Sequence, residues 1–320
     1  MITALELKRR DRSWGKWAVT IVAMVLSAYV LAQPINGIAT KRALIAPSTS
    51  LGGARITARP KPVAGLPDFA GYLSWLSPSV VAARGSQMYV VDGGRRQIFV
   101  YDSARQTMAP FAAYSAGNVS GITVAPDLSL YVADTFARQV LHFSVDGRLL
   151  RTFGNNTEVA RPVAVVLDEP SGRVWVADSL YNHVVVFNSL GRILSVLQSR
   201  AGRSVEAMAL GPDGLYLVDK LERQVVVMGH DGIDRYTLGK QSLKSPGAIA
   251  VDRFNRVFVS DSFDNTIKVY ERGQLMTSFG GSGATPALFN RIGSLWLDQN
   301  MLYVADSGNA RVQIFRVEPP

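Results

Sequence analysis

Short runs dominated by apolar residues recur along most of this chain, and a polar or turn-forming residue ends each one. The run "LYVADSGNARVQIF", Leu302 to Phe315, has five counterparts: "MYVVDGGRRQIFVY", "LYVADTFARQVLHF", "VWVADSLYNHVVVF", "LYLVDKLERQVVVM" and "VFVSDSFDNTIKVY". Their shared aspartates are Asp92, Asp134, Asp178, Asp219, Asp261 and Asp306, spaced by 42, 44, 41, 42 and 45 residues. A period of this length indicates a repeat architecture.

Each copy extends to four short strands. In the third copy these are "PVAVVLD" (Pro162 to Asp168), "VWVAD" (Val174 to Asp178), "HVVVF" (His183 to Phe187) and "RILSVL" (Arg192 to Leu197). Pro170-Ser171-Gly172 and Leu190-Gly191 supply the turn residues of the first and third hairpins. Four antiparallel strands in each of six units predict an all-β, six-bladed propeller.

The six copies resemble NHL repeats, because Leu302 to Phe315 follows the NHL pattern almost letter for letter and the copies cover about residues 71 to 317. WD40 repeats have a similar length, but their Trp-Asp pair follows the third strand, whereas the aspartate here ends the second. The resemblance implies a binding ring, since NHL domains serve as sensor domains of bacterial receptor kinases and as interaction domains of tripartite-motif proteins. No kinase or RING segment accompanies the ring here, so we expect it to act through a partner.

The last unit lacks a fourth strand of its own, because the chain after Arg316-Val317 is too short to supply one. "GYLSWL", Gly71 to Leu76, is similar to the Gly-led fourth strands of other units, and the "SPSVVA" that follows matches "SPGAIA" at the start of unit five. We therefore predict that this amino-terminal strand completes the sixth blade and removes two open sheet edges.

The amino-terminal region is predicted to enter a membrane. Trp17 to Ala32 is sixteen apolar or small residues without a charge, roughly 24 Å as a helix. Five basic residues precede this run and two follow shortly after it, which favours a cytoplasmic amino terminus and an exported ring. A signal peptide cleaved after Ala32 is the alternative.

The resulting organisation is a basic tail (1–16), a transmembrane helix or signal anchor (17–38), a flexible linker (39–67) and the propeller (68–320). The expected location is a single pass through the inner (plasma) membrane, with the propeller periplasmic. From Gln33 to Pro67 the chain is rich in Ala, Pro, Ser, Gly and Thr, so a coil there would reach roughly 30 to 35 Å.

The net charge of +9 belongs mainly to this amino-terminal region. Residues 1–67 hold ten Lys and Arg against two Asp and Glu, which leaves 24 of the 34 basic and 23 of the 25 acidic residues for the ring. A nearly neutral, exported ring disfavours a nucleic-acid partner. The chain has no cysteine, which excludes disulfides, thiolate metal sites and a cysteine nucleophile.

Most of the candidate chemistry has a structural interpretation. The repeated aspartates end strands, where a carboxylate accepts N–H bonds from the following turn. His142, His183 and His230 fall at three different levels of three blades, which does not suit a zinc site. The first-strand stretches that would line the central channel are apolar or small, with Glu206 the only acidic residue among them: "GITVA", "PVAVV", "EAMAL", "GAIAV" and "GSLWL". An exported metal-dependent hydrolase or lyase acting at the channel mouth is therefore the alternative function, and we expect no cofactor.

The favoured function is a binding or scaffolding module for a protein, peptide or cell-envelope polymer. Loops between second and third strands and between blades mix aromatic residues with arginines, as protein-binding surfaces do. Such residues also brace neighbouring loops in NHL repeats, so both interpretations stay open. Repeated arginines would favour an acidic partner. The candidates are Arg95, Arg96, Phe136, Arg138, Arg161, Tyr181, His183, Arg223, Phe263, Asn265, Asn309, Arg291 and Arg311.

Overall fold

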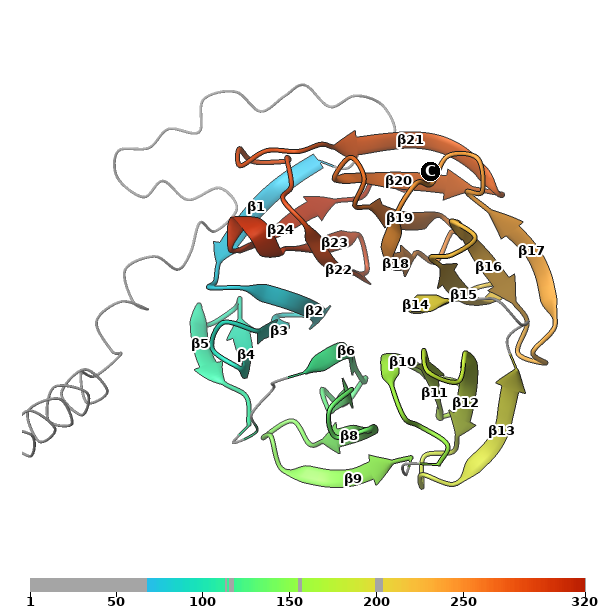
Figure 1. The fold of residues 1–320 in the computed structure, drawn as a ribbon. Coiled ribbons are helices and arrows are strands. Elements are labelled where there is room, and N and C mark those ends of the chain that lie inside the picture. The colour runs from blue at the N-terminus through green and yellow to red at the C-terminus, as the bar shows by residue number, and fades with distance from the viewer. Residues whose placement is uncertain (1–67, 113, 115–117, 155–156, 199–203, 320) are drawn as a thin grey trace, which may run out of the picture. The chain divides into compact units, whose positions relative to one another are not determined.

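The computed structural model describes residues 68–112, 114, 118–154, 157–198 and 204–319. These residues form six four-stranded antiparallel sheets arranged as the blades of a propeller (Figure 1). The predicted tail, membrane segment and linker all lie outside the described residues. Within the described part of the chain, no helix has both the length and the apolar character that a membrane crossing requires.

The strands follow the chain in order through the first three blades. Blade 1 contains β2 (Pro78–Arg84), β3 (Gln87–Asp92), β4 (Gln97–Asp102) and β5 (Thr107–Pro110). Blade 2 contains β6 (Val119–Val124), β7 (Leu130–Asp134), β8 (Gln139–Phe143) and β9 (Leu149–Phe153). Blade 3 contains β10 (Pro162–Asp168), β11 (Arg173–Asp178), β12 (His183–Phe187) and β13 (Ile193–Gln198). The four strands predicted for this third unit are confirmed, with bounds shifted by one residue at β11 and β13.

The remaining blades repeat the same order until the sixth. Blade 4 contains β14 (Val205–Gly211), β15 (Gly214–Asp219), β16 (Gln224–Met228) and β17 (Asp234–Leu238). Blade 5 contains β18 (Pro246–Val251), β19 (Val257–Asp261), β20 (Thr266–Glu271) and β21 (Gln274–Gly280). Blade 6 contains β22 (Ile292–Asp298), β23 (Met301–Asp306), β24 (Arg311–Arg316) and, as its outer strand, β1 (Asp68–Ser74); the short 3₁₀ turn η2 (Ser307–Asn309) follows β23.

Closure of the ring by the amino-terminal strand is confirmed. β1 pairs antiparallel with β24, with Leu73 opposite Val312 and Ser74 opposite Arg311. The pairing continues past the strand end, where the Trp75 amide donates to the carbonyl of Ala310 at 2.7 Å. The two ends of the described chain are therefore held in one sheet, as Figure 1 shows for β1 beside β24. Unfolding of the sixth blade must therefore separate β1 from β24.

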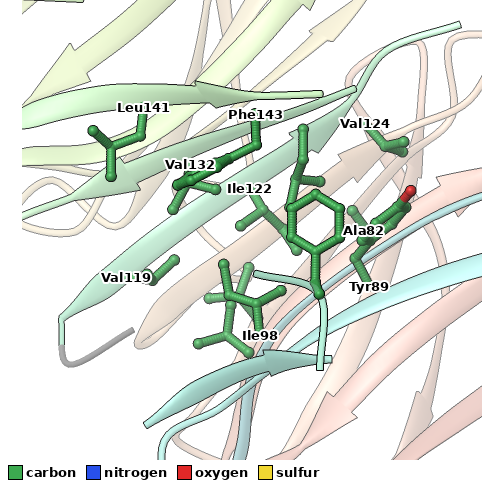
Figure 2. Packing of buried hydrophobic residues seen from close by; sticks show 13 residues of the cluster. Ala82, Tyr89, Ile98, Val119, Ile122, Val124, Val132, Leu141 and Phe143 are labelled. Atoms are coloured by element: carbon green, nitrogen blue, oxygen red, sulfur yellow. The ribbon is translucent and has the colours of Figure 1, made fainter. Parts of the chain in front are cut away.

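Strand alternation explains why the inner strands read as continuous apolar runs. Successive side chains of a strand point to opposite faces, and in a propeller both faces of a blade pack against a neighbouring blade. In β2, Val80 and Ala82 face blade 2, whereas Val81 and Ala83 face blade 6. Figure 2 shows the blade 1–blade 2 cluster, in which Tyr89 and Ile98 of blade 1 meet Val132 and Phe143 of blade 2. Comparable clusters fill the other five interfaces.

The innermost strands, β2, β6, β10, β14, β18 and β22, surround the axis and are called the first strands below (Figure 1). Neighbouring first strands approach closely where a glycine occurs. A Cβ on Gly293 of β22 would lie 2.5 Å from the carbonyl oxygen of Ser79 in β2 and 2.6 Å from Ser307 Oγ. A side chain at this position would force blades 6 and 1 apart.

Candidate functional site

A central cavity of about 920 Å³ runs along the propeller axis, lined by the first strands. Its walls are mostly Val, Ala, Leu and Ile, as the sequence predicted, with Glu206 of β14 the acidic residue on a first strand. The first strands begin on the face where the aspartate turns lie, because the amides of Ser179 and Ser307, just after Asp178 and Asp306, donate to the carbonyls of Arg161 and Arg291 at 2.9 and 3.1 Å. We call this the turn face.

Six ionisable residues line the cavity: Arg84, Arg161, Glu169, Glu206, Lys220 and Arg291. Arg84 and Glu169 form an ion pair where β2 and β10 end, away from the turn face. Lys220 Nζ lies 2.9 Å from Glu206 Oε1 near the turn face. Within the described residues, no group of three or more His, Cys, Asp or Glu side chains is placed to hold a metal ion.

The six repeated aspartates are structural, as predicted. Asp178 is fully buried; its Oδ1 accepts the amides of Leu180 and Tyr181, both at 2.9 Å, and its Oδ2 accepts those of Ala160 and Arg161 at 2.7 and 2.5 Å. One carboxylate thus fixes both the turn after the second strand and the loop that enters the first strand. Backbone amides also donate to the other five aspartates, Asp92, Asp134, Asp219, Asp261 and Asp306.

Two of these aspartates are further engaged by a buried cation. Burial tends to raise the pKa of Asp261, but hydrogen bonds from Lys268 and from three backbone amides outweigh it and hold that pKa below its usual value. Asp306 Oδ2 accepts from Arg311 Nε at 2.8 Å, and Arg311 also donates to the carbonyls of Ala284, Thr285 and Leu288. Blades 5 and 6 are therefore anchored by charge as well as by the backbone.

The residue four positions after each aspartate adopts a left-handed conformation in every blade. Their φ angles lie between 52° and 55°. These residues are Arg96, Arg138, Asn182, Arg223, Asn265 and Ala310. Arg96, Arg138 and Arg223 therefore occupy equivalent positions in blades 1, 2 and 4, because the same turn geometry gives all three backbones the same local direction. All three are exposed. Among the described residues, no hydrogen bond or ion pair of their guanidinium groups is found.

The residue two positions after the aspartate is exposed and apolar in four successive blades. Phe136 is 83% exposed, Leu180 57%, Leu221 64% and Phe263 65%. Leu180 and Leu221 were missed by the sequence reasoning, which selected aromatic and charged side chains. Superposing the six turns on their aspartates would have found them, since the position reads Gly, Phe, Leu, Leu, Phe, Gly around the ring. Tyr181, also predicted, lies exposed beside Leu180.

Other predicted residues of this face contact the chain itself. Arg95 forms an ion pair with Asp92 at 2.5 Å, and Asn265 Oδ1 accepts the Arg291 amide at 3.0 Å. Asn309 Nδ2 donates to Asp306 Oδ2 and to the carbonyl of Gly283, both at 2.8 Å. Arg311, described above, and His183 are buried. These five side chains brace loops of the turn face.

None of the three histidines lines the cavity. His183 Nε2 donates to the carbonyl of Glu158 at 2.8 Å, and the His230 ring lies 5.5 Å from that of Trp175. His142 stacks on Tyr131 with 4.1 Å between ring centroids, and its Nε2 lies 2.9 Å from Ser129 Oγ. Burial lowers the pKa of His142, partly offset by Asp127. Each histidine therefore contacts a ring or a polar group of the chain outside the cavity.

No protein-family model and no curated protein sequence matches this chain. Solved structures with a similar fold include selenomethionine-substituted virginiamycin B lyase from Staphylococcus aureus, 12% identical with a TM-score of 0.58 over 78% of this chain and 88% of that one. A catalytically inactive histidine-to-alanine variant of the S. aureus lyase with quinupristin is 11% identical, with a TM-score of 0.57 over 74% and 80%. A streptogramin B lyase is 11% identical, with a TM-score of 0.59 over 79% and 89%. Because the sequence identities are only 11–12%, the similarity shows that this chain has the same propeller fold and nothing more.

Proposed function

We propose that this protein is an NHL-type propeller that binds a macromolecular partner through its turn face. The carrying observation is the ring of exposed apolar side chains, Phe136, Leu180, Leu221 and Phe263, interleaved with Arg96, Arg138 and Arg223. Folding alone gives no reason to expose an apolar side chain at the same turn position in four successive blades, since each loses contact energy there. Exposed anchors among arginines are typical of a protein interface.

The charge of this surface favours an acidic partner. Guanidinium groups bind carboxylates in a planar, bidentate manner, and three in the same turn conformation are directed alike. Charges at the edge of an interface mainly raise the association rate and are screened by salt. Binding should therefore weaken between low and physiological ionic strength.

The test reverses charges on the turn face and at a matched place outside it. Arg138→Glu with Arg223→Glu changes the turn face, whereas Arg148→Glu with Arg192→Glu changes two exposed arginines next to the outer strands β9 and β13. The first variant should lose the proteins that the parent captures from a membrane extract, because its association rate falls about tenfold. The second variant should retain them. Equal retention or equal loss by the two variants would show that the turn face is not the binding site.

The proposed location is the extracytoplasmic side of a membrane, held by the segment Trp17 to Ala32. The sequence supports this through the apolar run and the excess of basic residues before it. A phosphatase fused after Pro320 should be active only outside the cytoplasm. The size of the mature chain then distinguishes an uncleaved anchor from a signal peptide cut after Ala32.

A lyase acting at the channel mouth is the second candidate function, and the similar folds of two streptogramin B lyases favour it. The central cavity would be the site. Incubating the purified chain with quinupristin and divalent metal ions, followed by liquid chromatography and mass spectrometry, tests this function. Conversion of quinupristin would support the lyase over the binding module, and an unchanged compound would remove this substrate class.

A further inference from the structure

The mouth of the central cavity on the turn face holds two arginines whose guanidinium groups form no hydrogen bond or ion pair with the described residues. Arg161 directly precedes β10 and Arg291 directly precedes β22, so they occupy the same position in blades 3 and 6. Both line the cavity. In a six-bladed ring, blades 3 and 6 stand opposite each other, as β10 and β22 do across the axis in Figure 1.

The charges of the cavity do not balance. Four cations and two anions line it; Arg84 pairs with Glu169, and Lys220 pairs with Glu206. Arg161 and Arg291 remain, and for neither guanidinium is an ion pair or hydrogen bond found within the described residues. Two like charges therefore face a cavity with apolar walls, where the field of a fixed charge is less screened than on an open surface.

The backbones of both arginines are nevertheless fixed. The Arg161 amide donates to Asp178 Oδ2 at 2.5 Å, and the Arg291 amide donates to Asn265 Oδ1 at 3.0 Å. Their carbonyls accept the amides of Ser179 and Ser307. A ligand that bridges the two side chains would thus meet Cα positions held at a constant separation, so less entropy is lost on binding.

Three hydroxyl groups near Arg161 already donate to the backbone. Ser120 Oγ and Thr135 Oγ1 donate to the carbonyl of Pro162 at 2.6 and 3.0 Å, and Ser179 Oγ donates to the carbonyl of Arg161 at 3.3 Å. Their protons are therefore not available to an anion. Recognition at this mouth would rest on the two guanidinium groups.

We propose that this mouth binds a small organic dianion, with one acid group, carboxylate or phosphate, on Arg161 and the other on Arg291. A guanidinium presents paired N–H donors that match either acid group. The cavity volume of about 920 Å³ is at the upper end of what small-molecule sites use. The apolar first strands would contact the chain of atoms that joins the two acids. Bridging makes the second contact intramolecular, so a dianion binds more tightly than two separate monoanions.

This site is independent of the proposed protein-binding function, because it lies inside the ring of exposed turn residues and takes a ligand of another class. Capture of a protein partner, tested with Arg138 and Arg223, has no bearing on it. Binding of a small dianion likewise has no bearing on partner capture. Either proposal can fail without the other.

The experiment is calorimetric titration of the full chain with α,ω-dicarboxylates of increasing length, from succinate upward, and with α,ω-bisphosphonates of matched lengths. Acetate and inorganic phosphate serve as probes with one acid group. We expect one chain length to bind best, and Arg161→Gln and Arg291→Gln each to weaken it by about 10- to 100-fold and to abolish the length preference. Arg192→Gln, at an exposed arginine beside the outer strand β13 and outside the cavity lining, is the control and should bind like the parent.

Thermal melting separates binding from folding. Within the described residues no hydrogen bond or ion pair of either guanidinium group is found, so both variants should melt like the parent. Tighter binding of the dicarboxylates or of the bisphosphonates identifies which acid group the mouth prefers. Failure of every dianion to bind the parent would overturn the proposal. So would binding of acetate as tight as that of the best dianion, or equal weakening by Arg192→Gln.

Discussion

Replacing Leu73 by alanine measures how much the closing strand contributes to the ring. Leu73 is 7% exposed and packs between blades 6 and 1, against the cluster that contains Val81, Val90 and Val312. Deleting a buried leucine side chain costs roughly 3 kcal/mol when the surroundings cannot collapse into the space. For a domain of this size each kcal/mol shifts Tm by about 2–4 °C, so we expect a loss of about 6–12 °C.

Leu149→Ala is the matched control, because Leu149 also lies on the outer strand of a blade, β9, but is 50% exposed. It should cost less than about 1 kcal/mol. Urea unfolding followed by tryptophan fluorescence gives both values, and an unchanged m shows that the ring still unfolds as one unit. Removing residues 1–78 entirely should leave β24 with an exposed edge and lower m. Equal losses for Leu73→Ala and Leu149→Ala would refute the reasoning that β1 secures the ring.

Three further predictions concern ionisable side chains within the fold. Arg311→Met should destabilise the ring by about 3–5 kcal/mol, because it leaves Asp306 without its ion pair and removes a donor from three carbonyls, of which Thr285 and Leu288 keep another donor; Arg316→Met, at an exposed site on the same strand, should change the urea midpoint little. The pKa of Asp261 is below 3.8 in the folded state, so its contribution is present above that pH and is lost as pH falls through the folded pKa; Lys268→Met should make the urea midpoint depend less on pH below about pH 4. His142 has a pKa below 6.5 when folded, so the unfolded chain binds the proton more tightly and stability falls as pH drops below 6.5; His142→Phe should lack this step in denaturant titrations, and a step of unchanged size in that variant would assign it to another group.

Periodicity was enough to predict the architecture. Six aspartates at nearly constant spacing defined the blades, and strand alternation within each copy placed the four strands to within a residue in blade 3. The order of the blades follows from the chain, because consecutive antiparallel units pack side by side. Even the closure by β1 was visible, since the sixth copy lacked one strand and the segment from Gly71 supplied it.

The roles of individual arginine side chains were not visible in the sequence. Arg95, Arg96 and Arg311 are the same residue type near the same repeated turn, yet Arg95 and Arg311 pair with aspartates while Arg96 is exposed. Which role a side chain takes depends on whether a carboxylate or carbonyl of a neighbouring loop lies within about 3 Å, and sequence spacing does not encode that distance.

The sequence by itself determined the repeat, the strands and the closure of this ring. These features depend on the alternation of apolar and polar residues and on the spacing of the repeated aspartates, and both can be read from one sequence. Only the tertiary structure decided which charges remain unpaired. Arg84, Glu169, Glu206 and Lys220 come from blades 1, 3 and 4 and neutralise one another in two pairs at the cavity wall. Arg161 and Arg291, 130 positions apart in the chain, are left at the same mouth because a ring of six blades places the third opposite the sixth.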